Sequence, residues 1–201
     1  MNQNSFYHLL ESQQNPVILL EGTRDLSAEK AGTLTQFATD VARRLPHARF
    51  RTGNAKGSDE AFAKGIIAVD VTRLEYVLPY TGHRKKDRPE VCESKALSEI
   101  SALRVNEVVN ATIASSPKYE RLAVNYRDGK IAPRQKAVAQ LLLRDTLKVT
   151  GTDDMPPPCV GIFYVNAADP DSGGTGHTIR VCRVQGIPVI TQFEWMGWNC
   201  E

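Results

Sequence analysis

Short apolar runs alternate with helical patterns over the first 80 residues. Residues 17–20 form an apolar run without a polar break, as in a strand buried on both faces of a parallel sheet. The apolar positions of residues 34–45 then follow the spacing of one helix face. Ser27 is placed to cap the start of this helix and Pro46 to end it. The pattern therefore predicts a strand followed by a helix that packs back on it.

The same alternation continues in both halves of the chain. Further strands are predicted at residues 48–52, 74–78, 159–165 and 187–190, and further helices at residues 61–69 and between a glycine-rich loop and Gln185. Gly186 is suited to end that last helix. Strands and helices that alternate at these spacings build right-handed crossover units. We therefore predict an α/β fold, a Rossmann-like three-layer parallel sheet with the strand order 3-2-1-4-5.

Residues 80–158 interrupt the alternation. They contain a basic loop, residues 83–88, and two helical patterns, around residues 97–111 and 135–147. The three prolines at 156–158 predict a stiff, extended lead into the next strand. We interpret this segment as a helical insertion between strands 3 and 4 of one domain that spans residues 1–201.

The composition mainly excludes classes of protein and kinds of site. The chain is 41% hydrophobic and 24% charged with a formal net charge of +2, which is ordinary for a globular protein and gives no sign of nucleic-acid binding through bulk charge. The cysteines are too scattered for a zinc site or a disulfide framework, so we expect reduced thiols and no metal; they are Cys92, Cys159, Cys182 and Cys200. No signal peptide or membrane span is evident, so we expect a cytoplasmic protein without a membrane partner.

Three unusual loops follow predicted strands. They are Gly22-Thr23-Arg24-Asp25 after strand 1, residues 53–59 after strand 2 and residues 171–178 after strand 4. Ligands of open parallel sheets bind at the carboxyl ends of the strands, where the strand order reverses. We therefore expect the three loops to converge on one ligand site.

The third loop has the features of a phosphate site. A glycine-rich turn that leads directly into a helix leaves backbone N–H groups free for an anion, and the helix dipole adds to the attraction. We expect the phosphates near Gly22, Thr23, Arg24, Gly173, Gly174, Thr175 and Thr178, and a sugar near Asn54, Ser58 and Asp59. Gly53, Ser172 and His177 complete the predicted ligand-binding set.

Three of the polar residues have alternative roles. His177 could exchange protons, but positive charge is disfavoured near the first turn of a helix, which favours a neutral, hydrogen-bonding histidine. Asp59 and Glu60 stand at a helix start, where acids cap free N–H groups. Capping and ligand contact are equally good interpretations of these two acids, which are also the candidate catalytic residues.

These loops resemble those of a known family. Gly22-Thr23-Arg24, residues 52–59 with Gly65, and residues 172–175 followed by residues 186–189 are similar to the G-S-R, S-G-x-A-x-G-I-D and S-G-[ST] motifs of the DNA-processing protein A (DprA/Smf) Rossmann fold. The resemblance covers residues 16–79 and 159–192. It extends to the SLOG superfamily, which also contains the LOG (lysine-decarboxylase-like) phosphoribohydrolases.

The resemblance implies three alternative functions. DprA-like proteins bind single-stranded DNA, LOG enzymes cleave the N-glycosidic bond of nucleoside monophosphates, and other SLOG domains bind ligands such as NAD or ADP-ribose derivatives. Residues 177–180 carry no carboxylate where LOG enzymes have a glutamate, which favours recognition over hydrolysis. We expect a nucleotide-derived, phosphate-bearing small ligand and no resident cofactor. There are two alternatives. One is the binding of single-stranded DNA, and the other is an N-glycosidic hydrolase or transferase that uses Asp59 or Glu60. The resemblance also implies a homo-oligomer.

Overall fold

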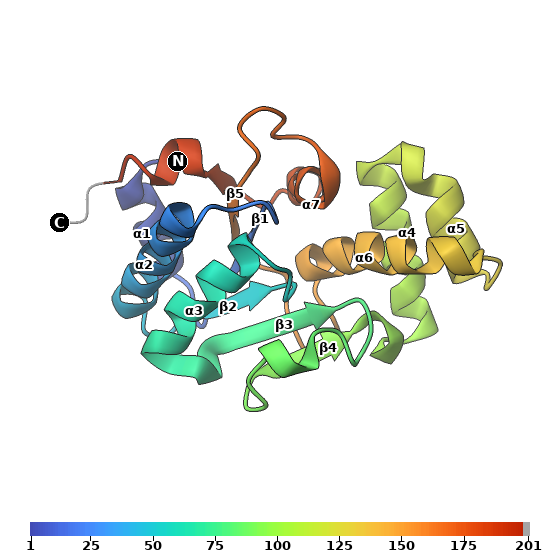
Figure 1. Ribbon diagram of the computed structural model, residues 1–201, viewed down its shortest axis with the longest axis horizontal. Coiled ribbons are helices and arrows are strands. Elements are labelled where there is room, and N and C mark those ends of the chain that lie inside the picture. Colours follow the sequence, from blue (N-terminus) through green and yellow to red (C-terminus); the bar gives the residue numbers. More distant parts are fainter. Residues whose placement is uncertain (199–201) are drawn as a thin grey trace.

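A computed structural model describes residues 1–198 and has a parallel sheet at its centre (Figure 1). Six strands lie in the order β4-β3-β2-β1-β5-β6, and every neighbouring pair is parallel. They are β1 (Val17–Gly22), β2 (Arg49–Thr52), β3 (Leu74–Leu78), β4 (Glu93–Ala96), β5 (Val160–Tyr164) and β6 (Val189–Thr191). The α/β class is confirmed, and the five predicted strands have the predicted relative order.

The central strand β1 supplies side chains to both faces of the sheet. Ile18 and Leu20 belong to a core cluster on one face, whereas Leu19 belongs to a separate cluster on the other. Successive side chains of a strand point to opposite faces, so both sets of side chains in the first part of β1 pack into a core. This double burial is the reason for the unbroken apolar run in the sequence.

Helices cover both faces. The first face carries α1 (Gln3–Glu11), α2 (Ala28–Arg44), α3 (Ser58–Asp70) and α8 (Gln192–Trp195), whose buried side chains join one cluster. Ser27 caps α2 as predicted, since its hydroxyl accepts a hydrogen bond from Lys30 N. The other face carries α7 (Gly173–Val184) and the end of α6 (Pro133–Thr150). None of the helices within residues 1–198 has the length and apolar character of a membrane-spanning segment.

The insertion forms a small helical layer beside the sheet. Figure 1 shows α4 (Ala102–Ser115), α5 (Glu120–Arg127) and α6 grouped together at one end of the molecule. The short helices are η1 (Val71–Arg73), η2 (Lys85–Asp87), η3 (Leu97–Glu99) and η4 (Pro117–Tyr119). Val108, Leu143 and Leu147 form part of a cluster that ties these helices to β3 through Val77. The insertion is thus anchored on the sheet.

The prediction that the insertion is purely helical is wrong, because β4 lies within it. β4 pairs with β3 from Glu75 opposite Glu93 to Leu78 opposite Ala96. It is an edge strand, and Glu93 is ion-paired with Arg49 at the surface. Edge strands carry charged side chains readily because one side meets solvent, so β4 lacks the apolar run that identifies β1 and β5.

Candidate functional site

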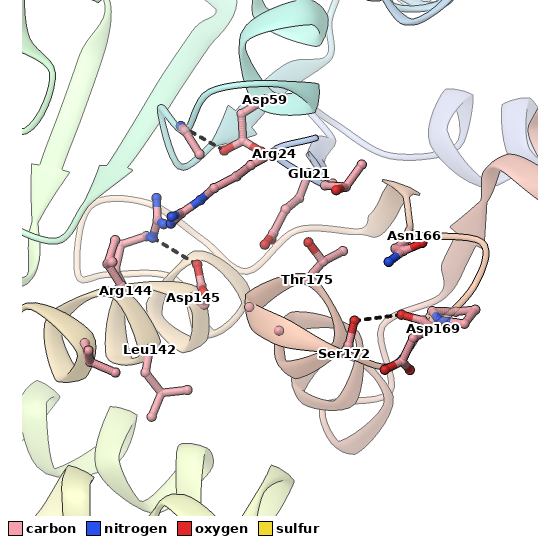
Figure 2. Close-up of a pocket in the computed structure, with 18 of the residues that line it drawn as sticks. Glu21, Arg24, Asp59, Leu142, Arg144, Asp145, Asn166, Asp169, Ser172 and Thr175 are labelled. Atoms are coloured by element: carbon pink, nitrogen blue, oxygen red, sulfur yellow. Dashed lines mark hydrogen bonds and ion pairs between the residues drawn. The ribbon is translucent and has the colours of Figure 1, made fainter. Parts of the chain in front are cut away.

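A cavity of about 480 Å³ lies beyond the carboxyl ends of β1 and β5 (Figure 2). Its volume is in the range of small-molecule sites, and its place is that expected for ligands of open parallel sheets. Eight predicted ligand-binding residues line it: Gly22, Thr23, Arg24, Asp59, Ser172, Gly173, Gly174 and Thr175. The first and third loops therefore converge in space as predicted, and the second contributes Ala55 and Asp59.

The loop after β1 is held rigidly, and this fixes the start of the Arg24 side chain. Thr23 N donates to Tyr164 O at 2.8 Å, and Ser58 donates to Thr23 O through its backbone N (3.0 Å) and its hydroxyl (2.8 Å). Gly57 has φ 80°, and a Cβ there would lie 2.6 Å from Arg24 O. Among the described residues, the exposed guanidinium of Arg24 has no ion pair or hydrogen bond.

The first turn of α7 is open toward the cavity. Ser172 occupies the N-cap position, but its hydroxyl donates to Asp169 O at 2.8 Å and caps nothing. The turn contains no acidic residue, and the first backbone bond of the helix runs from Gly176 N to Ser172 O. The N–H groups at Gly173, Gly174 and Thr175 therefore have no capping side chain in the described chain, which is the arrangement that favours an anion.

A buried ionic cluster forms the floor of the cavity. Lys148 Nζ lies 2.6 Å from Glu21 Oε2 and 3.0 Å from Asp145 Oδ1, and Arg144 Nε lies 3.0 Å from the same Asp145 oxygen. These side chains are almost fully buried. Asp145 also approaches α7 so closely that a Cβ on Gly174 would lie 2.8 Å from Asp145 Oδ2. Gly174 is thus required for the close packing of α6 against α7 at this point.

The Lys148 ammonium contacts both buried carboxylates of this cluster, Glu21 and Asp145, and the pKa values of the two shift in opposite directions. Burial raises the pKa of Glu21 to about 8, against the opposing charge of Lys148 and with the support of Asp145 and Asp59. Burial also disfavours the charged form of Asp145, but Lys148 and Arg144 outweigh it and lower the pKa of Asp145 below its usual value. Glu21 is therefore the member of the cluster that gains or loses a proton near neutral pH.

Asp59 lies at the cavity with one oxygen unused. Its Oδ2 accepts hydrogen bonds from Gly53 N (3.1 Å) and Ala55 N (3.2 Å), so it holds the second loop in place. Its Oδ1 is buried and has no hydrogen-bond partner among the described residues. A buried carboxylate oxygen without a donor is unfavourable unless a ligand supplies one. Asp59 thus caps the loop and can also contact a ligand.

His177 and Thr178 lie beneath the cavity and do not line it. The His177 ring is fully buried, with Nδ1 3.0 Å from Ser116 Oγ and Nε2 2.9 Å from Thr146 Oγ1. Burial lowers the pKa of His177 to about 4, so the ring is neutral near pH 7, as the sequence favoured. The Thr178 hydroxyl donates to Glu21 Oε1 and is not available to a phosphate. Both residues support the floor of the site from below.

Four other predicted residues also lie outside the cavity. Ser58 is used in the loop contacts, and the Gly53 carbonyl accepts a hydrogen bond from Arg144. Asn54 is buried, and its Nδ2 donates to the carbonyls of His83 and Arg84, which tethers the basic loop. Glu60 is half exposed and pairs with Lys64 and Arg84. The expected contact of Asn54 and Ser58 with a sugar does not fit this placement, because neither residue lines the cavity and the Asn54 Nδ2 and the Ser58 hydroxyl already donate to backbone carbonyls.

The contribution of the insertion was not predicted. Figure 2 shows Arg144 and Asp145 on α6, with Arg144 and Arg24 extending toward one another on the side opposite Ser172 and Thr175. The remaining lining residues that the sequence did not indicate are Glu21, Ala55, Tyr119, Val138, Leu141, Leu142, Asn166, Asp169 and Pro170. Charged residues on a helix usually face solvent, so sequence alone gives no signal that those of α6 turn inward.

The fold and the site define a Rossmann-like α/β protein with a cavity at the carboxyl ends of its strands. No protein-family model matches the chain, and no curated protein matches it. Among solved structures, the chain is similar to DNA processing protein A from Helicobacter pylori, described for its single-stranded DNA binding mode. The two are 13% identical with a TM-score of 0.49, over 92% of this chain and 67% of that one. A likeness of this extent leaves the function to be argued from the site.

Proposed function

We propose that this protein binds a small, nucleotide-derived ligand with a phosphate group in the cavity at the ends of β1 and β5. The observation that carries the proposal is the uncapped first turn of α7, which lines the same cavity as the unpaired guanidinium of Arg24. Free N–H groups at a helix start and an arginine are the two groups that proteins most often direct at a phosphate.

The acidic floor fits the rest of such a ligand. Glu21, Asp59 and Asp145 would repel a phosphate placed directly on them, but buried carboxylate oxygens accept hydrogen bonds from hydroxyl groups. The unused Oδ1 of Asp59 needs such a donor. A sugar with free hydroxyls on the floor and a phosphate at the uncapped first turn of α7 therefore satisfies both halves of the cavity, and the exposed Arg24 side chain enters the same cavity from the opposite side.

A thermal-shift screen tests the proposal. The protein is heated with nucleoside monophosphates, NAD, ADP-ribose, ribose 5-phosphate and inorganic phosphate in turn. A ligand at 100 times its Kd stabilises the native state by about 2.7 kcal/mol, which raises Tm by roughly 5–10 °C in a domain of this size. No stabilisation by any phosphate compound would contradict the proposal.

A pair of arginine variants tests whether the ligand binds in this cavity. Arg24→Gln removes the unpaired cation at the cavity, and we expect at least a tenfold loss of affinity for the best compound, since a charge-assisted bond contributes about 1.5–3 kcal/mol. Arg43→Gln is the matched control, because Arg43 is an exposed arginine on α2 that does not line the cavity. Equal affinity in both variants would remove Arg24 from the site.

Single-stranded DNA is the alternative occupant, because it presents the same phosphate chemistry. A thymidine oligonucleotide assayed between 50 and 200 mM salt separates the two. DNA held by several phosphate contacts loses affinity steeply over this range, whereas a small ligand with one phosphate changes little. Tight, salt-dependent binding of the oligonucleotide without binding of any mononucleotide would favour the DNA function over the one proposed.

A further inference from the structure

One face of α6 lines the cavity and changes character along the helix. Val138, Leu141 and Leu142 stand three and four residues apart, and Asp145 follows at the next turn of the same stripe. The amino-terminal part of this face is apolar, and the carboxyl-terminal part carries the ionic cluster. The cavity therefore has an apolar end and a charged end, both set by one helix.

Two of the apolar side chains of this stripe, Val138 and Leu141, are not buried in a core, whereas Leu142 is 7% exposed. Leu143 and Leu147, on another side of the helix, are fully buried in the cluster of the insertion. By contrast, Val138 is 57% exposed, and none of the three cavity-lining apolar residues belongs to a core cluster. Apolar surface that faces a cavity is stabilised when a ligand covers it.

Tyr119 completes this wall with an aromatic ring. It ends η4, where its N–H donates to Ser116 O at 3.0 Å. Its ring meets the buried His177 ring nearly edge-on, with 5.8 Å between centroids and 88° between planes. Lys118 holds its ammonium 5.1 Å from the Tyr119 centroid. These contacts support the ring in a fixed position at the cavity.

We propose that Tyr119, Val138, Leu141 and Leu142 form a subsite for the planar aromatic ring of the ligand, its nucleobase or an equivalent heterocycle. The inference rests on the proposed function and adds which end of the ligand enters the insertion. The ring lies against the apolar wall, the sugar lies on the carboxylates, and the phosphate lies at the first turn of α7 in the cavity that Arg24 also lines. The wall offers ring faces and methyl groups, so it accepts different bases with similar affinity, as stacking platforms do.

Comparison of nucleotides with their base-free core tests this assignment. Kd is measured by calorimetry for AMP, UMP and ribose 5-phosphate. Stacking of one base is expected to make each nucleotide bind roughly 5- to 150-fold tighter than ribose 5-phosphate. Tyr119→Ala should bring AMP to within about threefold of ribose 5-phosphate, and Tyr119→Phe should keep most of the difference.

A second pair of variants is independent of the fold around Tyr119. Val138→Asn places an amide on the wall, and Val184→Asn does the same on α7, away from the cavity; the two valines are 57% and 53% exposed. We expect Val138→Asn to weaken AMP about threefold or more, to leave ribose 5-phosphate unchanged, and Val184→Asn to change neither.

The outcomes separate the inference from the function on which it rests. If AMP, UMP and ribose 5-phosphate bind equally and neither Tyr119→Ala nor Val138→Asn changes this, the ring subsite is overturned while the phosphate site stands. If none of the three compounds binds and oligonucleotides do not bind either, the proposed function fails and the subsite fails with it. A nucleotide preference that only the wall variants remove supports the subsite.

Discussion

Removal of the Lys148 ammonium tests whether the ionic cluster below the cavity is held together by charge. Lys148→Met keeps the length of the side chain and leaves Glu21 and Asp145 buried without the cation that lies 2.6 and 3.0 Å away. Loss of one partner of a buried ion pair costs about 3–5 kcal/mol. For a domain of this size we therefore expect Tm to fall by roughly 6–20 °C.

The loss of stability in Lys148→Met depends on pH in a defined direction. The pKa of Glu21 is already raised to about 8, so the folded state binds a proton there that the unfolded state releases above about 4.5. Such a group contributes stability that is full below 4.5 and is lost as pH rises toward 8. Without Lys148 the preference for the protonated carboxyl is stronger, so the deficit should be larger at pH 8 than at pH 5.

Urea unfolding at pH 5 and pH 8 measures this. Lys64→Met is the matched control, because Lys64 pairs with Glu60 at 3.3 Å but its side chain is 66% exposed, and such a pair contributes about 0–1 kcal/mol. Glu21→Gln in the Lys148→Met background should recover part of the loss at pH 8, because a buried amide, unlike the Glu21 carboxyl, does not have to take up a proton on folding. A deficit no larger than that of Lys64→Met, or one unchanged between pH 5 and pH 8, would refute the electrostatic explanation.

Two further results are expected. His177 has a pKa of about 4 in the fold, so the unfolded state takes up its proton first as pH falls from 6.5, and His177→Gln should reduce the stability lost between pH 7 and pH 4.5 by about 2–3 kcal/mol in urea unfolding; an identical loss in both proteins would contradict the assignment. Asp59→Asn should weaken nucleotide binding and abolish any release of free base, whereas the neighbouring Glu60→Gln, outside the cavity, should leave both unchanged in calorimetry and chromatography; the opposite ranking would exchange their roles.

The strands β1 and β5 were predictable because each is buried on both faces. The runs around Ile18 and Ile162 have no polar break, and their carboxyl ends mark where ligands bind in such sheets. This rule alone predicted that Arg24 and Gly173 lie at the same site. β4 escaped prediction because an edge strand with charged side chains has neither an apolar run nor strict alternation.

The floor of the cavity was not predictable for a different reason. Arg144, Asp145 and Lys148 have the spacing of ordinary surface charges on a helix. They are buried because Lys148 meets Glu21, more than 120 positions away, and Arg144 meets the Gly53 carbonyl, 91 positions away. Pairing across that distance in sequence leaves no local pattern. The same holds for Asn54, whose amide is taken up by the basic loop and not by a ligand.

Because α6 lines both ends of the cavity, the helix fixes the distance between the apolar wall and the carboxylate of Asp145. Asp145 lies seven positions after Val138, and at 1.5 Å per residue this sets about 10 Å along the helix between the far end of the apolar wall and the carboxylate. This spacing is rigid, because the backbone hydrogen bonds of a helix fix the rise per residue, whereas a loop can change its shape. In the proposed complex, a ligand would be selected by the distance between its ring and its hydroxyl groups, whichever ring it carries.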